Sequence, residues 1–167
     1  MNAANQLERL RDAARDDPEA FWGSVADEFV HWSRKPSRVF VHEPPTFRWF
    51  EGGITNIAWS AVDRNIEEGR GDQVAIIGAD ERGGRRSVTY HELLELVRQI
   101  AAALRGLGVG RGDRVTIYMP TTIEAIATML AAARIGAIHS VVFAGFGAGA
   151  LGDRVRACGS KVVIAAD

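Results

Sequence analysis

Two stretches of the chain repeat apolar residues at steps of three and four, the spacing that places them on one face of an α-helix. The first begins at Thr89, which forms a capping-box pattern with Glu92: each side chain can accept a hydrogen bond from the other residue's backbone N–H. Gly106 and Gly108 predict where this helix ends. Its apolar positions are Leu93, Leu94, Val97, Ile100, Ala101 and Leu104, with polar residues between them.

The second stretch, from Thr122 to Ile135, is apolar on nearly every side. A helix with this pattern is covered by other elements on two sides. Thr121 and Glu124 predict a second capping box at its start, and Gly136 predicts its end.

Short apolar segments alternate with these helices. We expect strands at 114–119, 138–143 and 161–165, a glycine-rich turn at 144–149 and a short helix at 150–158. The resulting βαβαβ order predicts an α/β fold with a parallel sheet and helices on its faces. The last strand has no strand after it, so we expect an incomplete sheet with an exposed edge, which favours pairing with another chain.

The first part of the chain follows a different pattern. The first forty residues are predicted to be helical, with Asp17 as an N-cap and Pro18 at the first helical position. A Pro-containing extended arm follows and ends in an aromatic cluster, and the segments 74–77 and 87–89 predict a hairpin. We therefore divide the chain into a helical leader and extended arm at 1–72 and an incomplete α/β domain at 73–167.

Composition narrows the classes of function. The 47% hydrophobic content is that of a globular protein, and 20 basic against 21 acidic residues give no field that would attract nucleic acid or a membrane surface. Cys158 is the only cysteine, which excludes an internal disulfide and a cysteine-based zinc site within these residues. The first residues lack the apolar run of a secretory signal, so we expect a cytoplasmic protein.

The glycine-rich turn is the strongest local signal for ligand binding. Gly145, Gly147 and Ala150 match a relaxed dinucleotide-binding fingerprint, and Asp167 lies 22 residues after Gly145, near where an acid would contact a ribose. A dinucleotide-binding domain that uses Gly145, Gly147 and Asp167 is therefore one hypothesis. The alternative is that the glycines only permit a tight turn. The turn's late position in the chain disfavours the first hypothesis, because the fingerprint belongs to the first crossover of that fold.

Other chemistry-bearing residues give weaker signals. His139 lies in the most apolar predicted strand, which indicates a core histidine rather than a ligand. No histidine is paired with another histidine or an acid at a metal-ligand spacing, so we expect no metal site. The neighbours Asp63 and Arg64, and likewise Asp153 and Arg154, are either ion pairs or exposed neighbours, and we favour the interpretation as solvent-exposed charges.

Several motifs together carry a resemblance that spans almost the whole chain. They are Trp49-Phe50-Glu51-Gly52-Gly53, Asn56 with Val62-Asp63-Arg64, Ser87-Val88-Thr89-Tyr90, Leu107-Gly108-Val109 with Gly112-Asp113-Arg114-Val115, and the run from Ala132 to Phe143. On these residues the chain resembles the N-terminal segment of acetyl-CoA and propionyl-CoA synthetases, members of the adenylate-forming superfamily. The helical pattern from Phe21 to Trp32 resembles the leader of the same enzymes.

The resemblance implies an AMP-forming acid–CoA ligase that acts on acetate or propionate. In the family, ATP, CoA and magnesium serve a reaction in which a carboxylate forms an acyl-adenylate and the CoA thiol then displaces AMP. The family's phosphate loop followed by Lys, its adenylate-binding aromatic motif and its C-terminal domain with the catalytic lysine are not in this sequence. We therefore expect a truncated chain that is inactive alone, has no catalytic residue of its own and binds none of these cofactors tightly.

The one site that the resemblance places here is part of the CoA channel. The equivalent turn comprises Phe143, Ala144 and Gly145, where small residues would let the backbone approach the ligand. The family usually has Gly-Gly-Phe-Ser at this turn, whereas this chain has Ala144-Gly145-Phe146-Gly147. The added methyl group of Ala144 and the missing serine alter the turn's detailed geometry.

Overall fold

The computed structural model describes residues 3–166 of the chain. The chain forms two compact units, Met1–Thr55 and Asn56–Asp167, and each has its own elements. The boundary at residue 55 falls inside the segment 1–72 that the sequence assigned to the leader and arm.

The first unit begins with two helices, α1 (Ala3–Asp16) and α2 (Pro18–Phe29). Asp17 separates them and accepts a hydrogen bond from the backbone N–H of Ala20 at 2.9 Å, which satisfies one of the free donors at the start of α2. The prediction of Asp17 as N-cap and Pro18 as first helical residue is confirmed.

The predicted extended arm pairs with itself. Strands β1 (Arg38–Glu43) and β2 (Thr46–Glu51) form an antiparallel hairpin in which Phe40 lies opposite Trp49 and His42 opposite Phe47. The ring centroids of these two pairs are 4.3 Å and 4.5 Å apart. The sequence pattern indicated extended backbone here but not the pairing. Cross-strand aromatic contacts of this kind stabilise a two-stranded sheet that has few other partners.

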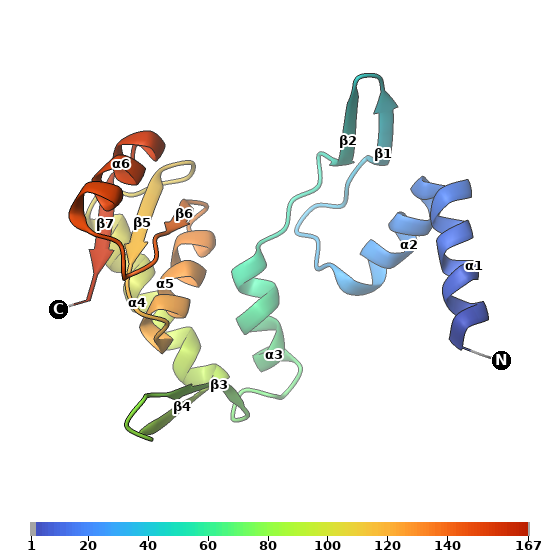
Figure 1. Ribbon diagram of the computed structural model, residues 1–167. Coiled ribbons are helices and arrows are strands. Elements are labelled where there is room, and N and C mark those ends of the chain that lie inside the picture. Colours follow the sequence, from blue (N-terminus) through green and yellow to red (C-terminus); the bar gives the residue numbers. More distant parts are fainter. Residues whose placement is uncertain (1–2, 167) are drawn as a thin grey trace. The chain divides into compact units, whose positions relative to one another are not determined.

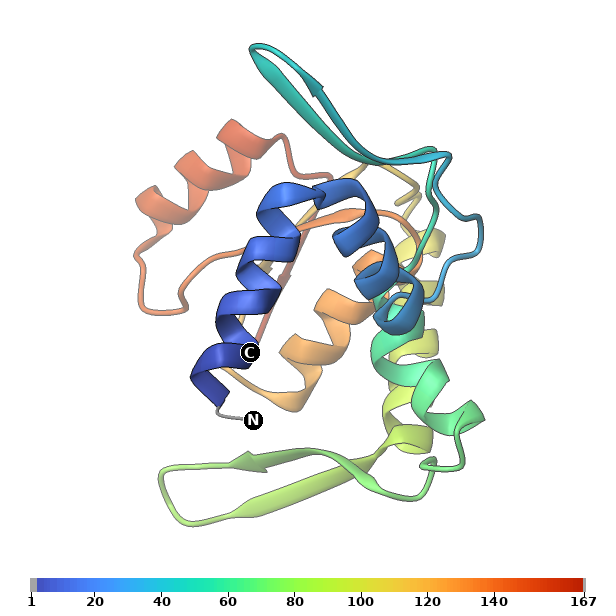
Figure 2. The same ribbon diagram turned by 90° about the vertical axis from the view of Figure 1, so that its right-hand side faces the viewer.

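The second unit opens with the short π-helical segment η1 (Trp59–Asp63), which continues into α3 (Arg64–Glu67). The predicted hairpin is confirmed: β3 (Val74–Ala79) pairs antiparallel with β4 (Arg85–Thr89). Figure 2 shows this hairpin, coloured green, extending away from the three-stranded sheet of the same unit.

Helix α4 (Tyr90–Gly106) starts directly after the hairpin, as predicted. The Thr89 side chain accepts from the Glu92 N–H at 3.2 Å, and the Glu92 carboxylate accepts from the Thr89 N–H at 2.7 Å, which completes the capping box. The apolar face of α4 is buried in the main core of the unit, through Leu93, Leu94, Val97, Ala101 and Leu104.

A three-stranded parallel sheet follows, in the order β6-β5-β7. Its strands are β5 (Arg114–Tyr118), β6 (Ile138–Val141) and β7 (Val162–Ala165), and the connections between them are helices α5 (Ile123–Arg134) and α6 (Ala148–Cys158). The expected mixed α/β class is confirmed. Figure 1 shows β5 between the other two strands.

The two faces of the sheet have different neighbours. Val115, which is fully buried, belongs to the core cluster formed with α4 and α5. Thr116 points to the opposite face because side chains alternate along a strand, and its hydroxyl lies 2.6 Å from the Ser160 hydroxyl, just after α6. Thus α4 and α5 cover one face, and the end of α6 lies at the other.

The start of α5 corrects one prediction. Thr122, not Thr121, is the N-cap: its side chain accepts from the Ala125 N–H at 3.2 Å. The expected box between Thr121 and Glu124 was therefore wrong by one residue. The chain leaves β5 through Pro120, and Thr122 is the residue whose backbone is still extended when the helix begins.

The two outer strands of the sheet expose apolar side chains, with Ile138 56% and Val163 43% accessible. Within residues 3–166, no helix combines the length and the apolar character needed to cross a membrane.

Candidate functional site

The glycine-rich turn between β6 and α6 lies at the carboxyl end of the parallel sheet. In open α/β sheets ligands bind outside this end of the strands, where the connecting turns gather. Val142 anchors the start of the turn: it is 1% exposed, and its N–H donates to the Ile117 carbonyl of β5 at 2.9 Å. The turn therefore leaves the sheet from a fixed point.

Tyr118, the last residue of β5, holds the other side of the turn. Its hydroxyl donates to the Phe146 carbonyl at 2.6 Å, and the Phe146 N–H donates to the Phe143 carbonyl at 3.0 Å. The rings of Phe143 and Phe146 meet edge to face with centroids 5.7 Å apart. These three contacts make residues 143–146 a closed loop fastened to the central strand.

Gly145 lies directly against a neighbouring aromatic ring. A Cβ atom at Gly145 would lie 2.5 Å from Cε1 of Phe143, much closer than carbon atoms can approach. The space beside this glycine is thus filled by the chain's own aromatic side chain. Phe143 itself is 71% exposed, so one large apolar surface of the turn faces outward.

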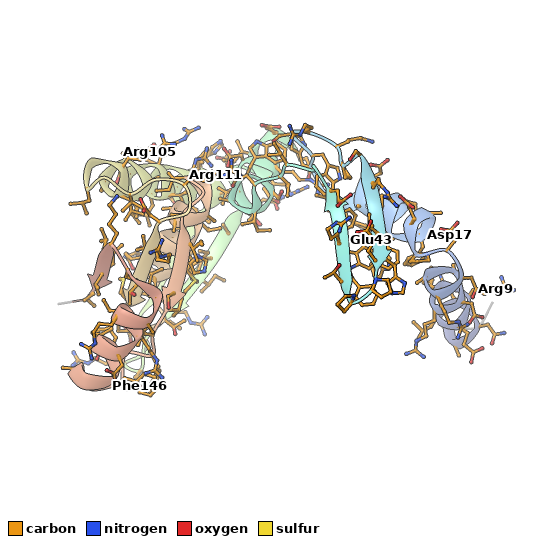
Figure 3. The ribbon with its side chains drawn as sticks, turned by 90° about the horizontal axis from the view of Figure 1, so that it is seen from above. Arg9, Asp17, Glu43, Arg105, Arg111 and Phe146 are labelled. Carbon is orange, nitrogen blue, oxygen red and sulfur yellow. The ribbon has the colours of Figure 1, made fainter. Side chains whose placement is uncertain are left out.

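Arg154 of α6 adds a positive charge to the turn. Its guanidinium carbon lies 4.4 Å from the ring centroid of Phe146, a cation–π arrangement, and its Nη1 donates to the Ala150 carbonyl at 3.0 Å. Figure 3 labels Phe146 next to α6. The interpretation of Arg154 as a solvated neighbour of Asp153 missed this contact, because the sequence does not show which ring a helix faces.

Helix α6 begins at this turn without a capping side chain. Its N-cap is Gly147, and the first backbone donors of the eleven-residue helix therefore have no side-chain acceptor at the cap. Together with Arg154 they make the end of the turn electropositive, which suits an anionic group. A hollow of about 380 Å³ lies elsewhere in the unit, beside the start of α5, and is lined by Thr121 to Glu124 and by residues of the β3–β4 hairpin.

A cluster of polar residues fixes the opposite end of α5. The Asp63 carboxylate accepts two hydrogen bonds from Arg134, at 2.6 and 2.8 Å, and the Asn56 amide donates to the carbonyls of Ala133 and Arg134 at 3.3 and 3.2 Å. The hydrogen bonding of its guanidinium to the Asp63 carboxylate raises the pKa of Arg134. The prediction of Asp63 as a solvated charge was wrong, because its partner lies 71 residues away along the chain.

His139 corrects another prediction. It was expected to be a core histidine, but its side chain is exposed on β6. The reason is that β6 is an outer strand of the sheet, so its apolar sequence does not lead to burial. Among residues 3–166, no three histidine, cysteine or acidic side chains come close enough to hold a metal ion.

Comparison with known proteins assigns the chain to a family. The family model described as AMP-binding enzyme matches residues 62–167, and the model of the acetyl-coenzyme A synthetase N-terminus matches residues 7–61. This chain belongs to the AMP-binding enzyme family. The resemblance inferred from the motifs is confirmed.

Two relatives of this AMP-binding protein show the same extent of similarity. The 3-hydroxypropionyl-coenzyme A synthetase of Metallosphaera sedula is 49% identical over 95% of the chain, and the acetyl-coenzyme A synthetase of Deinococcus radiodurans is 49% identical over 97%. These matches cover 24% and 25% of the two relatives, so the chain spans about a quarter of their length.

The AMP-binding assignment bears on the alternative hypothesis for the glycine turn. The comparisons give no support to a dinucleotide-binding domain. Asp167, the acid proposed for that role, lies outside the described residues. In addition, the ring of Phe143 fills the space beside Gly145.

Proposed function

We propose that this chain is the N-terminal segment of an AMP-forming acid–CoA ligase. In the reaction, a carboxylate oxygen attacks the α-phosphorus of ATP, pyrophosphate leaves, and an acyl-adenylate forms. The CoA thiolate then attacks the acyl carbon, and AMP leaves with the electrons of the broken C–O bond. The observation that carries the proposal is that the two family models together match residues 7–167.

The substrate class is a short-chain carboxylic acid. The names of the relatives point to acetate and 3-hydroxypropionate, and the motif resemblance points to acetate or propionate. Nothing in the described residues forms a pocket that we assign to the acyl group.

We assign Phe143, Ala144 and Gly145 to the path of CoA. The position of the turn at the carboxyl end of the sheet, its fastening to Tyr118 and the exposed ring of Phe143 support this role. The ring offers apolar surface to the pantetheine chain, and the electropositive start of α6 offers favourable surroundings to a phosphate.

We further propose that these 167 residues do not adenylate a carboxylate by themselves. They contain no Ser/Thr/Gly-rich loop followed by Lys, the element that would stabilise the charge developing on the phosphates. The test is pyrophosphate release from ATP and magnesium with acetate, propionate or 3-hydroxypropionate. We expect no release above the rate without protein; acid-dependent release by the purified chain would contradict this proposal.

The CoA assignment is tested by titrating the ¹⁵N-labelled chain with millimolar CoA and following backbone amide shifts. We expect the largest shifts at residues 143–146. Gly145→Ala should reduce them, because the new methyl group must displace the Phe143 ring. Gly149→Ala is the matched control, since a Cβ there meets nothing within 4 Å. Shifts confined to other segments, or equal losses in both variants, would refute the assignment.

A further inference from the structure

A groove between α4 and α5 is lined by arginines and small apolar residues. Its volume is about 350 Å³, within the range of pockets that hold small organic ligands. Its polar residues are Arg98, Arg105 and Arg134, and its apolar ones are Ala101, Ala102 and Ile135. We call this feature the arginine groove.

The charges of the arginine groove are only partly balanced. Arg134 is neutralised by Asp63, to which both of its terminal nitrogens donate. The side chains of Arg98 and Arg105 form no hydrogen bond or ion pair with any other residue of the described segment 3–166. No carboxylate is among the lining residues. Two uncompensated positive charges therefore face a partly enclosed apolar surface.

The two free arginines have a spacing that defines the ligand. They lie seven residues apart on α4, which places them on the same side of the helix and about 10 Å apart along its axis. Ala101 and Ala102 lie between them. Figure 3 labels Arg105 on α4. A ligand that satisfies both arginines needs two anionic groups joined by a body that can rest on alanine side chains.

We propose that the arginine groove binds a small organic ligand with two anionic groups, one on Arg98 and the other on Arg105, and with an apolar body against Ala101 and Ala102. The proposal is independent of the proposed ligase function. The groove includes the last turn of α5, which precedes the amino end of β6, whereas the turn assigned to CoA follows the carboxyl end of β6. The two features lie at opposite ends of the strand.

The test is isothermal titration calorimetry of the chain with hexane bisphosphate, which carries a phosphate at each end of a six-carbon chain, and with hexyl phosphate, which carries one phosphate, as the control. We expect binding of one hexane bisphosphate per chain, with hexyl phosphate weaker by about tenfold or more, because each charge-assisted contact contributes about that factor. Equal affinity for the two compounds, or no detectable binding of either, would overturn the proposal.

Variants locate the site. Arg98→Gln and Arg105→Gln should each weaken binding about tenfold, whereas Arg82→Gln, an exposed arginine in the β3–β4 turn, should leave the affinity unchanged although it removes the same charge. Ala102→Leu should also weaken binding, because the larger side chain fills space in the arginine groove without changing its charge. All four side chains are exposed, and circular dichroism checks that each variant is folded. Equal losses in the Arg82 and Arg98 variants, or full affinity after Ala102→Leu, would refute the groove as the site.

Discussion

Replacing Asp63 by Asn removes the charge that holds Arg134 at the end of α5. The two side chains are 12% and 25% exposed and form two hydrogen bonds, so the pair is neither a surface ion pair nor a fully buried one. Exposed pairs contribute about 0–1 kcal/mol, and breaking a buried pair costs about 3–5 kcal/mol. Asn keeps one acceptor oxygen, and we therefore expect Asp63→Asn to lower the free energy of unfolding by about 2 kcal/mol.

Urea unfolding followed by circular dichroism measures this loss. With a urea dependence of about 2 kcal/mol per M, the midpoint should fall by about 1 M. Asp153→Asn is the matched control: its pair with Arg156 has both side chains more than 70% exposed, at 72% and 74%, and should change the free energy by less than about 0.5 kcal/mol.

A double-mutant cycle separates the pair from its surroundings. The double variant Asp63→Asn with Arg134→Gln should lose much less free energy of unfolding than the sum of the losses in the two single variants. The reason is that the guanidinium left without its carboxylate in Asp63→Asn is absent from the double variant. An Asp63→Asn variant as stable as the original, or a fully additive double variant, would refute the reasoning.

Three further results are expected. In urea unfolding, Thr122→Ala should lower the free energy of unfolding by about 1 kcal/mol, while Thr121→Ala should be nearly neutral, since Thr122 is the residue that caps α5. A larger loss in Thr121→Ala than in Thr122→Ala would contradict this assignment of the cap. The Gly110 N–H and then Lys161 hold the pKa of Asp113 below its ordinary value. The ionised Asp113 therefore stabilises the fold above the unfolded-state pKa of about 4. The difference in free energy of unfolding between the original chain and Asp113→Asn should shrink as the pH falls below about 4. A difference that stays constant from pH 7 to pH 3 would contradict this. Tyr118→Phe should speed hydrogen exchange at the Phe146 amide by loosening the turn, and unchanged exchange would show that the hydroxyl does not hold it.

Local patterns predicted the elements of this chain well. The capping box of Thr89 and Glu92 located the start of α4 to the residue, and Asp17 with Pro18 did the same for α2, because each cap involves only neighbours in sequence. The one-residue error at Thr121 has the same origin: two adjacent threonines are both suitable caps, and the path of the backbone after Pro120 selects between them.

Features that depend on distant residues could not be predicted in this way. The pairing of Asp63 with Arg134 joins segments 71 residues apart, although both residues belonged to motifs that carried the family resemblance. His139 has an apolar sequence around it, yet the order of strands leaves it at the outside of the sheet. For the turn between β6 and α6, the glycine content indicated ligand binding. The contact of the Phe143 ring with Gly145 could not be predicted, because the spacing of residues does not specify the orientation of a side chain.

The position of β5 has a consequence for how the chain is made. Within residues 3–166 this strand pairs with β6 and β7, and both are synthesised after it, so β5 leaves the ribosome before either partner strand. Its register with β7 requires Val162 to Ala165, which are made only after α6. Pairing over such sequence separations is slow. During translation, the buried residues Val115 and Ile117 would depend on α4 and α5 for cover until β7 is made.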